Sequence, residues 1–282
     1  MLALVMTAPP APAAPPPAVV YEDDEIQVLH RPGGSACTLV SFAGRQKLAE
    51  GQLFWNQEQA ARLDLDTLGF VAKRPNWYPT PSMARAAAAV AALGRPVRLG
   101  YGLGMGGFAV LKHGRRLGLQ RALAIGPQYS IAPDIAPWET RLASFHRPAL
   151  HPDMWIHRRD LPSWSAAVLD PWDAPERGHA AALAALGTRI VAAPFLAQRV
   201  SVLFGGRLQE VLAPLEAGDA PGLRHLLRRR RRGSVTWYRR LAELAAAHGH
   251  DALAARLQQR ALALQARLSP DRPPQPQPGA AA

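Results

Sequence analysis

The sequence predicts an α/β fold in which a mainly parallel sheet is covered by helices on both faces. Short apolar segments typical of buried strands alternate with helical segments from residue 18 to about residue 205. Their spacing is that of parallel-sheet proteins. A glycine-rich turn at residues 102–107 joins the middle strand to a helix, and beyond residue 205 the pattern is purely helical. The helical pattern beyond residue 205 predicts a C-terminal helical segment.

Eight apolar runs are the expected strands, with an acidic turn between the first two. The expected strands are Val19–Tyr21, Ile26–Leu29, Cys37–Phe42, Leu68–Ala72, Val97–Leu99, Ala122–Ile125, Ala166–Leu169 and Arg189–Ala193. Four segments between them have helical patterns. The expected helices are Gln57–Leu63, Met83–Leu93, Phe108–His113 and Gly178–Leu186.

Composition divides the chain into four parts. Residues 1–17 are a Pro/Ala-rich leader that we expect to be disordered, and residues 269–282 form a second disordered tail. Residues 18–205 form the α/β domain, with a polar and aromatic excursion at 134–162 as a cap segment. Residues 206–268 form the helical segment, in which Ser234 is an expected N-cap, Gly249 a stop and Asp251 the cap of the last helix.

Charge and cysteine content limit the classes of function. The chain of 282 residues has 33 basic and 21 acidic side chains, a net charge of +12. Its one cysteine, Cys37, lies in an expected buried strand and excludes an intramolecular disulfide. The leader lacks the basic start of a signal peptide, and no run approaches the roughly 18 apolar residues of a membrane span. We expect a soluble, cytoplasmic protein, whose oligomeric state the sequence leaves open.

A run of five arginines, expected between two helices, accounts for much of the excess charge. The basic patch consists of Arg228, Arg229, Arg230, Arg231 and Arg232. Two interpretations stay open: a solvated helix face, the commoner use of such a run, and a contact site for a polyanion. Trp237 and Tyr238 follow the run, but no recognised nucleic-acid motif accompanies it.

The glycine-rich turn has the frame of a nucleophile elbow without its reactive atom. Gly102 and Gly106 occupy the outer positions of a Gly-x-Ser-x-Gly pattern, and Gly104 stands where the serine belongs. In this geometry the Met105 amide points into an oxyanion site, and the loop at Gly44 and Arg45 supplies a second donor. The pattern predicts an α/β-hydrolase-like fold in which the nucleophile position, occupied by Gly104, has no hydroxyl group.

The same glycines also satisfy the dinucleotide fingerprint Gly-x-Gly-x-x-Gly. However, the following strand does not end in the acidic residue that would bind a ribose, and earlier strands precede the turn. The histidines of the excursion lack the spacing of a metal site. We therefore predict no cofactor and no metal.

Residues 36–205 resemble a bacterial group of α/β-hydrolase-fold proteins with a Ser-Met-Gly-Gly-Tyr-Ala elbow, many of which occur near polysaccharide or glycosyltransferase functions. The resemblance is carried by the elbow and by four further segments. The matching segments are Met105–Ala109, Phe70–Tyr78, Pro127–Ser130, Leu169–Asp173 with a following His179, and Val191–Phe195. The resemblance implies a serine hydrolase triad in the order nucleophile, acid, histidine.

This chain departs from the implied triad at two of three positions. Gly104 replaces the serine, and Gln198 stands where the resemblance places the histidine. An amide does not titrate near neutral pH, so Gln198 cannot act as a base. The acid position is filled by Asp170 or Asp173. Loss of any triad member typically leaves only about 10³–10⁴-fold catalysis over water.

The sequence therefore predicts a catalytically impaired hydrolase-fold protein that binds a ligand or partner in the remaining pocket. The Met105 amide, Trp77, Tyr78 and Asp170 are the expected contacts, and a small-molecule or glycan-like compound is the expected ligand. The alternative is an active, esterase-like hydrolase, polysaccharide-related on the resemblance, in which Asp170 or Asp173 activates water. A third class is a basic interaction module that acts through the arginine run.

Overall fold

The computed structural model describes residues 16–196, 199–200, 203–204 and 207–268. The predicted tail at 269–282, and the predicted leader apart from residues 16 and 17, lie outside the described residues, as does Gln198. The expectations for these parts of the chain therefore stay predictions.

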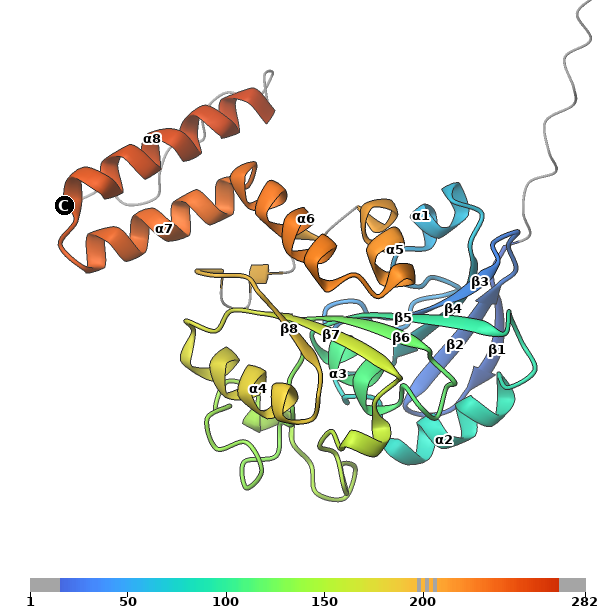
Figure 1. The fold of residues 1–282 in the computed structure, drawn as a ribbon. Helices are drawn as coiled ribbons and strands as arrows, with labels where there is room; N and C mark the ends of the chain where they lie inside the picture. The colour runs from blue at the N-terminus through green and yellow to red at the C-terminus, as the bar shows by residue number, and fades with distance from the viewer. Residues whose placement is uncertain (1–15, 197–198, 201–202, 205–206, 269–282) are drawn as a thin grey trace, which may run out of the picture.

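An eight-stranded sheet forms the centre of the molecule, with the strand order β1-β2-β4-β3-β5-β6-β7-β8 (Figure 1). Its strands are β1 (Ala18–Glu22), β2 (Ile26–Arg31), β3 (Cys37–Phe42), β4 (Asp66–Ala72), β5 (Val97–Leu103), β6 (Arg121–Ile125), β7 (Trp164–Leu169) and β8 (Arg189–Ala192). β2 pairs antiparallel with both β1 and β4, and all the other pairs are parallel. The predicted fold class is confirmed.

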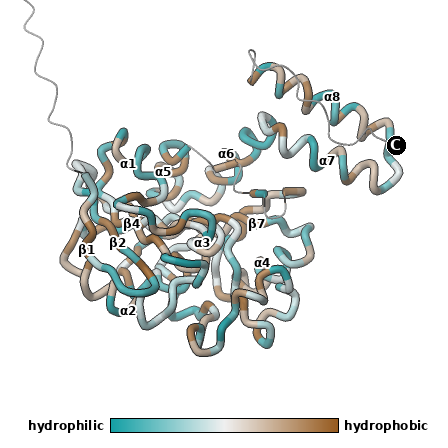
Figure 2. Tube along the Cα trace, turned by 180° about the vertical axis from the view of Figure 1, so that it is seen from behind, coloured by the Kyte–Doolittle hydropathy of each residue, from teal (hydrophilic) through white to brown (hydrophobic). Residues whose placement is uncertain are grey.

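Helices cover both faces of the sheet. Those on one face are α2 (Thr80–Ala89), α3 (Met105–Lys112) and α4 (Ala174–Ala185). Those on the other are α1 (Gln57–Arg62), α5 (Leu208–Ala217) and α6 (Ala220–Arg232). Each group buries apolar side chains against one side of the strands, which gives two cores separated by the sheet. Figure 2 shows the hydrophobic residues gathered along the strands.

Burial on both faces explains the continuous apolar runs of the central strands. All six residues of β3 and all seven of β4 are buried, as expected for parallel strands between two helical layers. Phe42 and Phe70 stack with their ring centroids 4.7 Å apart. The Cys37 thiol is buried, and burial raises its pKa. It is a packing group of the core rather than a nucleophile.

The C-terminal helices α7 (Val235–Ala247) and α8 (Asp251–Leu268) form a hairpin that projects beyond the sheet in both Figure 1 and Figure 2. Ser234 is the N-cap of α7, as predicted, and accepts a hydrogen bond from the Trp237 amide at 3.2 Å. Asp251 is the first residue of α8 and not its cap.

The arginine run lies inside a helix, which corrects the prediction that it separates two helices. It forms the last turns of α6, which ends at Arg232. Leu223, Leu226 and Leu227, three and four residues apart, give α6 an apolar side that packs on the sheet.

The excursion at 134–162 has no long element in the structure. It contains two single-turn helices, η1 (Ala143–Phe145) and η2 (Arg158–Asp160), and its Trp155 forms an isolated bridge with Ser130, which precedes the segment. Its Leu142 reaches the site described below. Among the described helices, none combines the length and the apolar character needed to cross a bilayer.

Candidate functional site: a cavity at the glycine elbow

Gly104 forms a sharp turn between β5 and α3. Its φ of 55° and ψ of −114° lie in a region that L-residues rarely adopt. The Gly104 amide donates to the Ile125 carbonyl at 2.7 Å, and the Gly104 carbonyl accepts from the Phe108 amide at 3.0 Å. A Cβ atom added at Gly104 would have no heavy atom within 4 Å outside its neighbours. The turn thus presents residue 104 to open space.

Close packing requires the two outer glycines of the turn. A Cβ on Gly102 would lie 2.1 Å from the Gly106 carbonyl oxygen, and one on Gly106 would lie 2.3 Å from the Phe42 carbonyl oxygen. Both distances are far below any real carbon contact. Helix α3 can therefore start directly above the ends of β3 and β5 only because these positions lack side chains.

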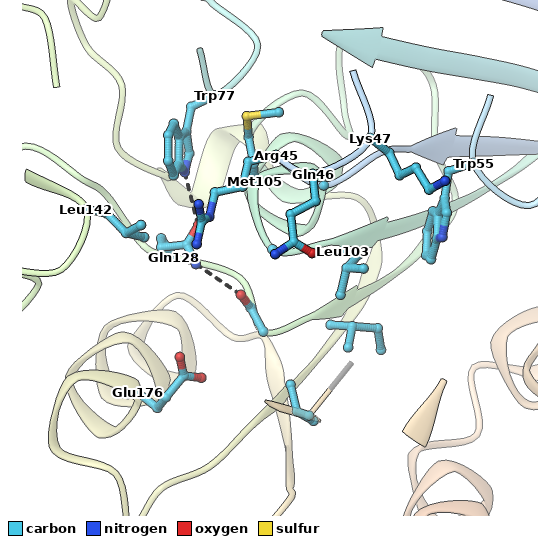
Figure 3. A pocket seen from close by; sticks show the side chains of 15 residues that line it. Arg45, Gln46, Lys47, Trp55, Trp77, Leu103, Met105, Gln128, Leu142 and Glu176 are labelled. Atoms are coloured by element: carbon cyan, nitrogen blue, oxygen red, sulfur yellow. Dashed lines mark hydrogen bonds between the residues drawn. The ribbon is translucent and has the colours of Figure 1, made fainter. Parts of the chain in front are cut away.

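A cavity of about 350 Å³ opens beside Gly104 at the carboxyl ends of the parallel strands, where α/β sheets bind their ligands. Figure 3 shows its lining. The described lining residues are Gly44, Arg45, Gln46, Lys47, Trp55, Trp77, Leu103, Gly104, Met105, Ile125, Gly126, Gln128, Leu142, Glu176 and Val200. No serine, threonine, cysteine or histidine occurs in this described lining.

The loop after β3 forms the cationic side of the cavity. It turns back on itself through a hydrogen bond from the Lys47 amide to the Gly44 carbonyl at 3.0 Å. The Arg45 guanidinium lies 5.8 Å from the centre of the Phe145 ring. Within the described part of the chain, neither Arg45 nor Lys47 makes an ion pair. Met105, the first residue of α3, adds a helix N-terminal amide.

Trp77, one of the expected ligand contacts, lies in the cavity wall. The residue is 1% exposed, and its Nε1 donates to Gln128 Oε1 at 3.0 Å. Gln128 in turn donates from Nε2 to the Gly126 carbonyl at 3.1 Å. Figure 3 shows both hydrogen bonds, which fix the ring against the cavity.

Tyr78, also predicted as a ligand contact, lies outside this lining. Its hydroxyl donates to the Ala43 carbonyl at 2.8 Å, with the Phe70 carbonyl at 3.2 Å. Burial raises its pKa far above the usual value. Tyr78 therefore ties the loop after β4 to the ends of β3 and β4, and it supports the cavity from behind.

Glu176 is the acidic residue that reaches the cavity, and the sequence did not indicate it. It lies in the first turn of α4 and is 1% exposed, and its Oε2 has no hydrogen-bond partner among the described residues. Its Oε1 lies 3.5 Å from Arg141 Nη2. Burial raises its pKa to about 7, the Arg141 charge opposes the rise, and Asp173, Glu139 and Asp170 add to it. The Asp173-x-x-Glu176 spacing is itself typical of a helix start, so it indicated a cap rather than a site.

Asp170 and Asp173, the predicted acids, are not among the described residues that line the cavity. Asp173 is the N-cap of α4 and pairs with Arg141 at 3.3 Å. Asp170 follows β7, is buried, and accepts a hydrogen bond from the Trp172 amide at 3.0 Å. Both carboxylates thus hold the backbone around the start of α4.

A buried ionic network lies behind Glu176. Glu139 accepts from His179 Nε2 at 2.9 Å and pairs with Arg141. Burial raises the pKa of Glu139, but the hydrogen bonds from Arg141 and His179 outweigh it and lower the value to about 2. His179 Nδ1 accepts from the Tyr129 amide at 3.1 Å and from Trp138 Nε1 at 3.3 Å. Both ring nitrogens of His179 are engaged, and the ring does not line the cavity.

Two serines near the strand ends are buried and hydrogen-bonded to the main chain. Ser41 is buried and donates to the Trp55 carbonyl at 2.9 Å. Ser130 is also buried and donates to the Met154 carbonyl at 3.1 Å. Within the part of the chain that the structure describes, neither hydroxyl has a histidine as a hydrogen-bond partner.

Comparison with known proteins supports the fold. No protein-family model matches the chain, and no curated relative does. Among solved structures, the capsule O-acetyltransferase of Neisseria meningitidis serogroup A is similar with a TM-score of 0.50 and 11% identity, over 68% of this chain and 93% of that one. An esterase of Pyrococcus furiosus is similar with a TM-score of 0.45 and 13% identity, over 70% of this chain and 92% of that one. The sheet topology, the elbow and the likeness to the O-acetyltransferase together show that the chain has the α/β-hydrolase fold.

Proposed function

We propose that this protein binds a small molecule in the cavity beside Gly104 and has no serine hydrolase activity. The observation that carries the proposal is Gly104 itself, which adopts the elbow conformation beside open space without a hydroxyl group. Beside Gly104, where a nucleophile would act, the structure has a cavity whose lining includes Arg45, Lys47 and the N-terminus of α3. Binding needs only these features, whereas acyl transfer also needs an attacking atom and a base.

The other triad positions support the same proposal. The resemblance places its histidine at Gln198, which lies outside the described residues but has no basic nitrogen whatever its position. The described lining contains no histidine, and His179 is held by Glu139. A residual acceleration of about 10³–10⁴-fold over water is too small for the main activity of an esterase.

A thermal-shift screen of small molecules tests binding, with a variant that fills the mouth of the cavity as the probe. Gln46 is exposed and lines the cavity, so Gln46→Trp should block entry without disturbing the core. Gln259→Trp on the exposed side of α8 is the matched control. We expect compounds that raise the melting temperature of the wild type and the control variant but not of Gln46→Trp. If Gln46→Trp responds like the wild type, the ligand site lies elsewhere.

Turnover is tested with a panel of esters, amides and thioesters. We expect the wild-type protein to give no hydrolysis above buffer. Hydrolysis that disappears in Asp170→Asn or Asp173→Asn would overturn the proposal and establish the predicted alternative of an aspartate-dependent hydrolase.

A second candidate function is hydrolysis with Glu176 as the water-activating base. The observation in its favour is the buried Glu176 carboxyl in the cavity wall, whose pKa of about 7 suits a general base at neutral pH. Hydrolysis by the wild type that is lost in Glu176→Gln, and kept in the two aspartate variants, would establish this function instead.

A further inference from the structure

A second cavity, of about 370 Å³, lies where α5, α6 and the start of α7 meet. These helices are labelled in Figure 1. The described lining residues are Leu203, Arg207, Glu210, Arg229, Arg230, Gly233 and Ser234. The cavity shares no described lining residue with the one beside Gly104. It is therefore a separate site, and its lining is mainly polar.

Three arginine side chains of this cavity converge on one carboxylate. Arg207 Nη1 and Arg230 Nη2 lie 3.1 Å and 3.5 Å from Glu210 Oε1. Arg229 Nη2 lies 3.5 Å from Glu210 Oε2. Because the three guanidinium groups share one partner, they lie close to one another.

This cluster keeps an excess of positive charge at neutral pH. Burial acts to raise the pKa of Glu210, but the hydrogen bond from Arg207 and the charge of Arg230 outweigh it and lower the value. Glu210 is therefore ionised, and three cations face a single anion. The cluster has a net charge of +2, which attracts an anion of matching charge.

The two outer arginines can turn to a ligand at little cost. The side chains of Arg207 and Arg229 are 61% and 62% exposed. Within the described chain, the polar partner of each side chain is Glu210 alone. A guanidinium has five N–H donors, so most of them are available to a second anion. Exposed ion pairs of this kind contribute only about 0–1 kcal/mol to stability.

Arg230 forms a fixed inner wall of the cavity. Its side chain is 6% exposed, its Nη1 donates to the Leu203 carbonyl at 2.5 Å, and its Nη2 donates to the Arg207 carbonyl at 3.2 Å. Burial lowers the pKa of Arg230, because a buried cation is costly. An anion in the cavity would offset part of that cost.

Ser234 brings the start of α7 to the same cavity. Its Oγ accepts from the Trp237 amide at 3.2 Å, and within the described chain its hydroxyl donates to no partner. As the N-cap of a 13-residue helix, Ser234 lies at the partially positive end of α7. The C-terminus of α6 lies at this junction too, but the full charges of its arginines outweigh its partial negative charge.

We propose that this cavity binds a phosphoryl group, as free phosphate or as a phosphate ester, with Arg207, Arg229 and the Ser234 hydroxyl as donors. A phosphoryl dianion matches the net charge of +2 and has acceptor oxygens for several donors, whereas a carboxylate has one charge and two oxygens. The site goes beyond a general polyanion contact of the arginine run, because Arg207 and Ser234 lie outside the run. It is independent of the ligand of the elbow cavity.

Titration calorimetry with inorganic phosphate, methyl phosphate and acetate tests the class of ligand. We expect saturable binding of at least one of the phosphates, and acetate should bind at least about tenfold more weakly. Binding of methyl phosphate would identify phosphate esters as the ligand, and binding of inorganic phosphate alone would identify the free ion. The proposal is overturned if neither phosphate binds or if acetate binds as tightly.

A pair of charge-matched variants on the helices tests the location. Arg207→Gln/Arg229→Gln removes two exposed charges that line the cavity and should weaken phosphate binding at least about tenfold. Arg224→Gln/Arg228→Gln removes two exposed charges of α6 outside the described lining and should keep the wild-type affinity within about threefold. Equal losses in the two variants would mean that phosphate responds to net charge, and would overturn the site.

Two substitutions of nearly the same shape test the part of Ser234. Asn and Asp are both good N-caps, so Ser234→Asn and Ser234→Asp should both keep α7 folded, which thermal unfolding in phosphate-free buffer checks. Only Asp adds a negative charge to the cavity. We expect Ser234→Asp to bind phosphate at least about tenfold more weakly than Ser234→Asn. Equal affinities in these two variants would exclude the anion from the start of α7 and overturn the proposal.

Discussion

Trp77 and Tyr78 adopt two consecutive left-handed backbone conformations at the edge of the cavity, with φ of 51° and 56°. Such conformations cost about 1–3 kcal/mol each for residues other than glycine. The Tyr78 amide donates to Asn76 Oδ1 at 3.0 Å, and the Tyr78 hydroxyl donates to the Ala43 carbonyl at 2.8 Å, with the Phe70 carbonyl at 3.2 Å. These bonds offset the strain, and the result is a rigid indole in the cavity wall.

Position 104 has room for a side chain, but its backbone conformation is one that residues other than glycine rarely adopt. Because its φ is 55°, Gly104→Ser should lower the free energy of unfolding by about 1–3 kcal/mol even though the new side chain meets open space. Urea denaturation measures this loss. Gly233→Ser is the control, since Gly233 has an ordinary φ of −99° and its added Cβ has no close contact. Equal losses in the two variants would show that backbone strain at position 104 is not the cause.

Glu176 and Glu139 should make stability depend on pH in opposite directions. Glu176 has a raised pKa of about 7, so its protonated form favours the folded state, and stability falls as pH rises from 4.5 to about 7. Glu139 has a lowered pKa of about 2, so its contribution is present above 4.5 and is lost as pH falls toward 2.

The Glu176→Gln variant isolates the first of these effects. It removes the cost of ionising a buried carboxyl, roughly 3 kcal/mol for a pKa rise from 4.5 to about 7. We expect the variant to gain stability relative to the wild type as pH rises from 5 to 8, measured by thermal unfolding at each pH. A difference between the two proteins that does not change with pH would mean that Glu176 titrates near its ordinary value.

At the scale of elements, α6 divides the arginine run between packing and solvent. Arg230 is held against the body of the protein: its Nη1 donates to the Leu203 carbonyl at 2.5 Å, and its guanidinium lies 5.4 Å from the centre of the Phe204 ring. The Arg231 guanidinium lies 5.1 Å from the Trp237 ring, at the junction of α6 and α7. Arg228, Arg229 and Arg232 are exposed. The five arginines, although identical in sequence, therefore differ in their contacts and exposure.

Replacement of the packed arginine should destabilise the protein more than replacement of an exposed one. The Arg230 side chain is 6% exposed and also pairs with Glu210 at 3.5 Å. We expect Arg230→Ala to cost roughly 1–3 kcal/mol, because it breaks these contacts, and Arg232→Ala to stay within about 0.5 kcal/mol of the wild type. Chemical denaturation measures the loss of stability in both variants. Similar losses would contradict the view that Arg230 contributes to packing and Arg232 does not.

At the scale of the whole molecule, positive charge is concentrated in the C-terminal helices. Residues 220–268 contain eleven arginines and two acidic residues, so they carry nine of the twelve net positive charges of the chain. In Figure 1 the hairpin α7–α8 at the end of this segment projects away from the sheet. Six of these arginines lie on α6, whereas the projecting hairpin has five arginines and two acidic residues. The positive charge is therefore densest on α6, which favours contact with a polyanion there, and we keep this contact as a proposal.

Retention on heparin should depend on the exposed arginines of α6. Replacing Arg228, Arg229 and Arg232 with Gln should move elution to lower salt without loss of stability, since these side chains are exposed. The control replaces the exposed Arg62, Arg115 and Arg158, which lie outside the C-terminal helices. If both triple variants elute at the same salt concentration, the effect is one of net charge and the α6 surface is not a specific site.

The positions of the strands, their order along the chain and the elbow turn could be predicted from local sequence patterns alone. Each of the eight apolar runs corresponds to a strand of the sheet, and the glycines of residues 102–106 fixed the turn before any contact was known. Boundaries were less accurate: α4 starts at Ala174 rather than Gly178, because Asp173 caps it and Pro175 stabilises its first turn. Local signals of this kind need no partner elsewhere in the chain.

Which side chains line the same cavity depends on the tertiary structure and could not be predicted from local patterns. Glu176 enters it and Asp173 does not, although both belong to the start of α4, because that helix is oriented by its packing on the sheet. The same holds for Arg45 and Lys47, which line the same cavity as Glu176 although more than 120 residues of sequence separate them from it. Spacing predicts which face of an element a residue occupies, whereas the position of that face relative to distant residues depends on how the layers pack.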